Sequence, residues 1–127
     1  MSDLDRDKIR KEVLKSSQNW IVNFNNGDAR ACIDAYTIDA VLYAKPFGTF
    51  RGIQEIESFW KPFIETGAGD LEYSNVSVAI ENETTVLLTA DWKMNVGRGI
   101  ITMERWVKRG EGKWLLEFDD FEVQEQY

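Results

Sequence analysis

Hydrophobic positions recur at helical spacing in the first half of the chain. Four of them share one side of a first predicted helix: Ile9, Val13, Trp20 and Phe24. Gly27 is suited to ending this helix, and Asp28 to capping a second one over residues 29–36. A third helix is predicted from Gly52 to Phe63, where Pro62 is expected to bend or shorten its end.

The period changes after Gly69 to the alternation that is typical of strands. A short strand at residues 39–44 comes earlier, before a tight turn at 46–52. Four later segments are rich in β-branched and aromatic residues: 71–80, 84–94, 99–109 and 113–123. Three polar or glycine-containing turns separate them: 81–83, 95–98 and 109–112. Helices followed by strands predict a single α+β domain over residues 1–127, with three helices on one face of a mainly antiparallel sheet.

The later strands carry bulky apolar residues on both faces. In residues 86–94, one face holds Val86, Leu88, Ala90, Trp92 and Met94. The opposite face of that segment begins with Leu87, and residues 100–107 and 114–116 are also apolar on both sides. Because one layer of helices covers only one face of a sheet, we predict a homodimer in which two sheets pack face to face.

The charge balance excludes several kinds of partner. Fifteen basic and 22 acidic side chains give a net charge of −7 with no basic patch, so we expect no nucleic-acid binding. No apolar run approaches the roughly 20 residues that span a bilayer, so we expect no membrane insertion. Residues 1–5 lack the features of a secretory signal, so we expect a cytoplasmic protein.

The chain contains no histidine, and Cys32 is its single cysteine. Ser-His and Cys-His nucleophilic machinery is therefore excluded, as is any metal site that needs imidazole. We expect no metal and no other cofactor. Cys32 lies in an apolar stretch of the second predicted helix, where a buried and inert thiol is expected.

Carboxylates are the remaining acid–base candidates near neutral pH. Glu104 lies between Thr102 and Trp106 on one face of its predicted strand, and Asp119 interrupts an apolar run. A carboxyl group that pointed into the core would have a raised pKa and could serve as a general acid or base. The alternatives are an ion pair for Glu104 and a solvated position at the sheet rim for Asp119.

Aromatic residues are the candidates for a ligand pocket. Those on the predicted helices and strands could form a cup for a flat apolar ligand: Trp20, Phe24, Tyr36, Phe59, Trp92, Trp106 and Phe121. Ordinary core packing is the alternative, and the sequence does not decide between them for the set as a whole.

Four short motifs appear in a characteristic order. They are Asn-Gly-Asp at 26–28, Asp-Ala-Val at 39–41, Gly-Thr-Phe-Arg-Gly at 48–52 and Gly-Lys-Trp at 112–114. This order resembles the nuclear transport factor 2-like superfamily, which includes SnoaL-like and ketosteroid-isomerase-like proteins. The resemblance implies a cone-shaped, cystatin-like roll with a cavity between the helices and the concave sheet, and it implies that dimers are common.

The resemblance also argues against ketosteroid isomerase activity. Trp20 stands where those enzymes have a tyrosine in the first helix, and residues 44–46 contain no carboxylate where they have a general-base aspartate. Only their second acid has a counterpart, Glu104. The leading hypothesis is therefore the binding of an apolar or aromatic small molecule, with Glu104 as its polar contact. An isomerase, lyase or cyclase using Glu104 or Asp119, and a non-catalytic association module, are the alternatives.

Overall fold

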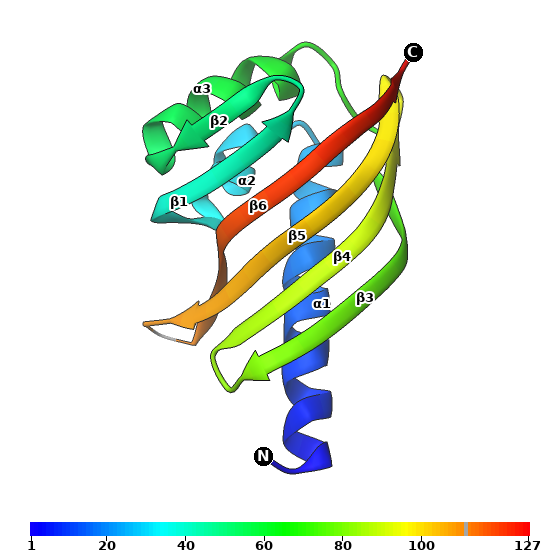
Figure 1. Ribbon diagram of the computed structural model, residues 1–127. Coiled ribbons are helices and arrows are strands. Elements are labelled where there is room, and N and C mark those ends of the chain that lie inside the picture. The colour runs from blue at the N-terminus through cyan, green and yellow to red at the C-terminus, as the bar shows by residue number, and fades with distance from the viewer. Residues whose placement is uncertain (111) are drawn as a thin grey trace.

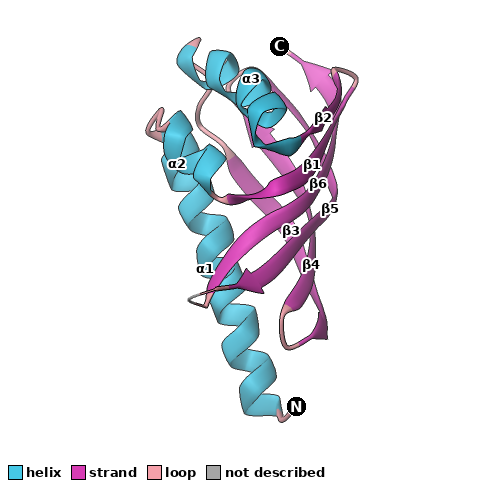
Figure 2. Ribbon diagram, turned by 90° about the vertical axis from the view of Figure 1, so that its left-hand side faces the viewer, coloured by secondary structure: helices cyan, strands magenta, loops and turns pink. Residues whose placement is uncertain are grey.

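A computed structural model describes residues 1–110 and 112–127. Within these residues, the chain forms three helices: α1 (Asp3–Asn25), α2 (Ala29–Asp34) and α3 (Gly52–Glu65). The same residues form six strands: β1 (Tyr36–Lys45), β2 (Gly48–Arg51), β3 (Glu72–Asn82), β4 (Thr85–Met94), β5 (Gly97–Arg109) and β6 (Lys113–Gln126). The helices lie on one side of a curved sheet (Figures 1 and 2), which confirms the predicted α+β architecture.

The sheet has the strand order β2-β1-β6-β5-β4-β3. β1 and β6 are parallel, and the other neighbouring strands are antiparallel, so the sheet is mixed but mainly antiparallel. On this side of the sheet, α1 runs across β3, β4 and β5, whereas α3 lies over β1 and β2 (Figure 1). The buried side chains of α1, α3 and the concave sheet face form one hydrophobic core.

Local interactions fix the first two helices. The Ser2 hydroxyl accepts a hydrogen bond from the Asp5 amide (3.1 Å), and the Asp5 carboxylate accepts one from the Ser2 amide (3.2 Å), which completes a capping box. The indole of Trp20 donates to the carbonyl oxygen of Cys32 (3.1 Å) and so ties α1 to α2. Burial raises the pKa of the Cys32 thiol to about 12, as expected for an inert cysteine.

Two predicted boundaries were wrong around the first strand. α2 ends at Asp34, and β1 begins at Tyr36, which the sequence pattern assigned to the helix. The predicted turn at 46–52 contains β2, which pairs with β1 through four registered residue pairs. The sequence pattern missed β2 because it is only four residues long and almost entirely exposed.

The third helix passes through Pro62 and continues to Glu65, two residues beyond its predicted end at Phe63. Its apolar face buries Ile56, Trp60 and Ile64, which are spaced one turn apart and contact the core on both sides of the proline. This burial outweighs the backbone hydrogen bond that the proline ring removes.

β5 begins at Gly97, two residues earlier than predicted. At Gly99 the strand passes so close to its neighbours that a β-carbon would collide with the Glu122 carbonyl oxygen and the Trp92 indole. Glycine is therefore required here by close packing within the sheet and not by a turn. The predicted turn at 109–112 includes Glu111, which lies outside the described residues.

Two β-bulges change which residues face the core. In β5, the register shifts between Ile101 and Met103, so that Ile101 and Glu104 both point inward while Thr102 is exposed. The prediction that Thr102 and Glu104 share a face was therefore wrong, because Thr102 is the extra residue of the bulge.

In β6, the register shifts where Trp106 pairs with Leu116 and Arg105 pairs with Phe118. Glu117 has no partner in this register, so it is the extra residue of the bulge. After it, Asp119 faces the core together with Leu116, although strict alternation from Leu116 would turn Asp119 outward. Each of the two candidate acids thus follows a bulge in its own strand.

None of the helices in the described part of the chain is long and apolar enough to cross a membrane.

Candidate functional site

Glu104 and Asp119 lie opposite each other on the adjacent strands β5 and β6. They are only 3% and 4% exposed, respectively. Over residues 1–110 and 112–127, no Lys or Arg forms an ion pair with either carboxyl group. Both alternatives weighed for these residues, an ion pair for Glu104 and a solvated rim position for Asp119, are therefore wrong.

Both oxygens of Glu104 accept hydrogen bonds from neutral aromatic side chains. The Tyr73 hydroxyl donates to Oε2 (2.8 Å), and the Trp106 indole donates to Oε1 (2.9 Å). Burial raises the pKa of Glu104 to about 7 from its ordinary value of 4.5, and the two hydrogen bonds oppose this shift.

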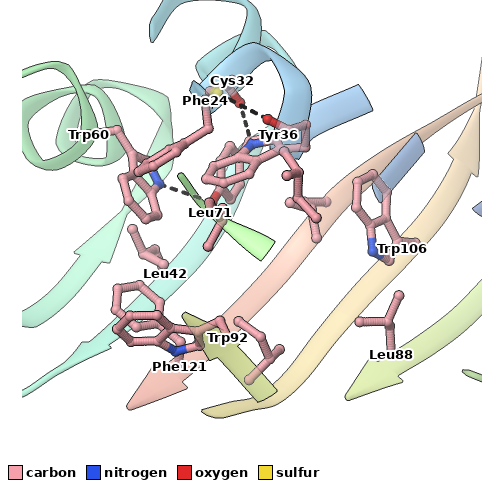
Figure 3. Close-up of a cluster of buried hydrophobic side chains, with 14 of the residues drawn as sticks. Phe24, Cys32, Tyr36, Leu42, Trp60, Leu71, Leu88, Trp92, Trp106 and Phe121 are labelled. Atoms are coloured by element: carbon pink, nitrogen blue, oxygen red, sulfur yellow. Dashed lines mark hydrogen bonds between the residues drawn. The ribbon is translucent and has the colours of Figure 1, made fainter. Parts of the chain in front are cut away.

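Asp119 is held on one side only. The Tyr36 hydroxyl donates to Oδ2 (2.7 Å) and itself accepts a hydrogen bond from the Trp60 indole (3.0 Å; Figure 3). The other oxygen, Oδ1, is buried and has no hydrogen-bond partner among the described residues. Burial, followed by the negative charge of Glu104, raises the pKa of Asp119 well above its ordinary value.

A cavity of about 240 Å³ lies beside Asp119, between the helices and the concave face of the sheet. Its walls are mainly apolar and include aromatic residues from α1, α3, β3, β4 and β6: Trp20, Phe24, Phe59, Trp60, Phe63, Tyr73, Trp92 and Phe121. Phe47, Val96 and Tyr127 line the cavity and are also exposed, so the cavity opens to solvent at this end. Asp119 contributes the one carboxyl side chain to the described lining.

Not all of the seven predicted pocket residues line the cavity. Five of them line the cavity: Trp20, Phe24, Phe59, Trp92 and Phe121. Tyr36 and Trp106 are not among the described residues that line the cavity. Tyr36 instead lies behind Asp119 as its hydrogen-bond donor, and Trp106 lies apart from Trp92 and Phe121 (Figure 3), where it contacts Glu104.

The two candidate acids also differ in position. Asp119 lines the cavity, whereas Glu104 is not among the lining residues in the described chain. Tyr73 connects Glu104 to the cavity, because it lines the cavity and its hydroxyl donates a hydrogen bond to Glu104.

Two residues of the site were not predicted from the sequence. Trp60 lies on the apolar face of the predicted third helix, a signal that could have placed it with the pocket aromatics. Tyr73 has no such signal, because it lies in a strand, β3, that is largely exposed. Among the described residues, no three Cys, Asp or Glu side chains are grouped as a metal site requires.

The comparisons with known proteins identify the family and support the fold. The family model for the SnoaL-like domain matches residues 18–120. The chain belongs to the SnoaL-like domain family. No curated protein matches the sequence significantly.

Solved structures similar to this SnoaL-like protein share its fold at low sequence identity. A scytalone dehydratase-like protein from Novosphingobium aromaticivorans is 12% identical, with a TM-score of 0.82 over 100% of this chain and 91% of the other. A ketosteroid isomerase-like protein from Erwinia carotovora atroseptica is 15% identical, with a TM-score of 0.77 over 91% and 95%. A protein of unknown function with a cystatin-like fold from Nostoc punctiforme is 18% identical, with a TM-score of 0.73 over 98% and 94%. These likenesses confirm the predicted cystatin-like cone.

Proposed function

We propose that this SnoaL-like protein binds a small, largely apolar molecule in the cavity between its helices and its sheet. The observation that carries the proposal is an aromatic cavity, open at one end, with a single buried carboxyl group in its described wall. Binding sites for small molecules are typically apolar hollows with a few polar groups that orient the ligand.

Asp119 is the polar contact in this proposal, in place of Glu104. Both oxygens of Glu104 already accept hydrogen bonds, so Glu104 has little capacity left for a ligand. Asp119 lines the cavity, the Tyr36 hydroxyl orients its Oδ2, and its Oδ1 has no hydrogen-bond partner among the described residues. An unpartnered buried polar atom costs free energy, and a ligand that satisfied it would recover part of that cost.

A pair of tryptophan substitutions tests the location of the ligand. Val123 lines the cavity on β6, and its neighbour Glu122 is exposed. Small aromatic alcohols and ketones should bind the unaltered protein, and Val123→Trp should weaken binding at least about tenfold by filling the open end, a change of roughly 1.4 kcal/mol. Isothermal titration calorimetry measures both affinities.

Glu122→Trp is the matched control, since it adds the same bulk on the same strand outside the cavity. It should bind like the unaltered protein. Equal binding to the unaltered protein and Val123→Trp would place the ligand elsewhere, and no binding of any of these compounds at millimolar concentration would contradict the proposal.

A second candidate function is proton transfer to or from the bound molecule by Asp119. It is favoured by the raised pKa of Asp119, since a buried acid that stays protonated can act as a general acid beside a substrate. Mass spectrometry of ligands recovered after incubation distinguishes the two: unchanged ligand supports binding alone, and a product that Asp119→Asn does not form supports catalysis.

We also propose that two copies of the chain pair through the convex face of the sheet. Six apolar side chains on that face are only half-buried in the single chain: Val41, Tyr43, Leu87, Ile100, Leu115 and Phe118. Pairing would remove them from water. Light scattering during size-exclusion chromatography should give twice the mass of one chain, and Phe118→Glu should shift the protein to monomer. A monomer at micromolar concentration without that substitution would contradict this proposal.

A further inference from the structure

The buried acid pair lacks any positive partner. The titratable groups that face Asp119 are Glu104 from β5, Tyr36 from β1 and Tyr73 from β3, with Asp120 next to it in the chain. All of these groups are neutral or negative. Buried carboxylates are normally neutralised by a cation or by protonation, and this pair has only the second option within the described chain.

The residues that line the cavity also favour a positively charged ligand over an anion. None of the described lining residues is Lys or Arg, so nothing there would compensate an anion. Aromatic residues make up much of the cavity wall, and the negative face of an aromatic ring attracts a cation. This attraction is strongest for tryptophan.

Several of these rings lie close to Asp119. Phe121 is two residues further along β6 and faces the same side. Its ring centroid lies 5.7 Å from that of Trp60 and 6.1 Å from that of Trp92. Trp60 is also linked to Asp119 through Tyr36, because its indole donates to the hydroxyl that holds the carboxyl group. The Asp119 carboxyl group and these aromatic rings thus line the same cavity.

We propose that the cavity accepts an amine in its ammonium form, with the nitrogen at the Asp119 carboxyl group and the apolar part against Trp60, Trp92 and Phe121. This inference rests on the proposed function and names the class of its ligand. On binding, the Asp119 carboxyl group loses its proton to the solvent, and the ammonium group donates a hydrogen bond to the resulting carboxylate. The balance is one proton released for each ammonium ion bound, and no covalent bond changes between heavy atoms.

Three ligands of similar size and different charge test the proposal. They are 2-phenylethylamine (a cation), 2-phenylethanol (neutral) and phenylacetate (an anion). The amine should bind at least about tenfold more tightly than the alcohol, which is the order of a single charge-assisted contact, and phenylacetate should bind least. Calorimetry of the amine in two buffers with different ionisation enthalpies should also show the release of about one proton.

Asp119→Asn should remove the preference for the amine and the release of a proton, while the alcohol still binds. Glu122→Gln removes an exposed carboxyl group from the same strand and should leave both unchanged. If Asp119→Asn does not fold, the proton count on the unaltered protein still tests the inference.

The outcomes separate this inference from the proposed function. If the alcohol binds as tightly as the amine, and Val123→Trp weakens its binding, the amine preference is overturned and the cavity remains the binding site. Amine that binds without proton release overturns the role of Asp119. Failure of all three ligands to bind overturns both proposals.

Discussion

Between pH 5 and pH 8, the free energy of unfolding of this protein should fall by at least about 2.5 kcal/mol. The cause is the buried acid pair: the pKa of Glu104 is about 7 in the folded chain and returns to about 4.5 on unfolding. Each unit of such a difference corresponds to about 1.4 kcal/mol. Asp119 shifts in the same direction and adds to the fall.

The direction of the change follows from proton binding. Above pH 4.5 the unfolded chain loses the Glu104 proton, whereas the folded chain keeps it until the pH approaches 7. The folded state therefore binds more protons in this window, and stability decreases as the pH rises. The carboxyl groups of Asp5, which is exposed, and Glu12, which is half-buried, have lowered pKa values, so their contributions change only at more acidic pH.

Urea denaturation at a series of pH values measures this effect. Glu104→Gln removes the titrating group, so its unfolding free energy should fall less over the window, while burial still raises the pKa of Asp119 and leaves part of the dependence. Glu122→Gln, at an exposed position of β6, should keep the full dependence. A stability that rises from pH 5 to pH 8 in the unaltered protein would show that the acid pair is solvated or paired with a cation.

Replacing Trp106 by alanine should destabilise the fold by about 3–5 kcal/mol, the range measured for truncating large buried aromatic residues. Trp106 is 1% exposed and packs in the core, and its indole is one of the two hydrogen-bond donors to Glu104. Truncation would therefore leave a cavity and a buried carboxyl oxygen without its donor.

Two further variants separate these contributions in chemical denaturation experiments. Trp106→Phe keeps most of the packing but loses the indole N–H, so it should cost about 1–3 kcal/mol, mainly at pH values where Glu104 is ionised. Ile38→Ala truncates a side chain that is 80% exposed and should change stability by less than about 0.5 kcal/mol. A cost for Trp106→Ala as small as that of Ile38→Ala would contradict the packing of β5 described above.

The helices and the later strands were predictable because their hydrophobic spacing is regular. Ile9, Val13, Trp20 and Phe24 follow one face of α1, and each is buried in the structure. Alternation in residues 86–94 likewise places Val86, Leu88 and Trp92 in the core. In both cases the spacing in the sequence matches the geometry of the element, so local pattern and tertiary packing agree.

The candidate site was predictable in its composition but not in its arrangement. The direction of Glu104 and Asp119 depends on bulges at Thr102 and Glu117, and a bulge leaves no mark in a pattern of apolar and polar residues. Trp106 shares a face with Glu104, as alternation predicted, but the sequence does not tell how far along β5 the cavity extends. Tyr36 was assigned to a helix and lies in β1, where it reaches Asp119 across parallel strands.

The bulge in β5 also has a consequence for how such a site could persist during evolution. Upstream of it, odd-numbered residues point inward, as Gly99 and Ile101 do; downstream, even-numbered residues do so, as Glu104 and Trp106 do. Thr102 is the extra residue, so deleting it while keeping the upstream pairing would remove the bulge and leave the acid and the indole facing the core. A gene can therefore gain or lose the codon for this residue without turning the interior acid to the convex side.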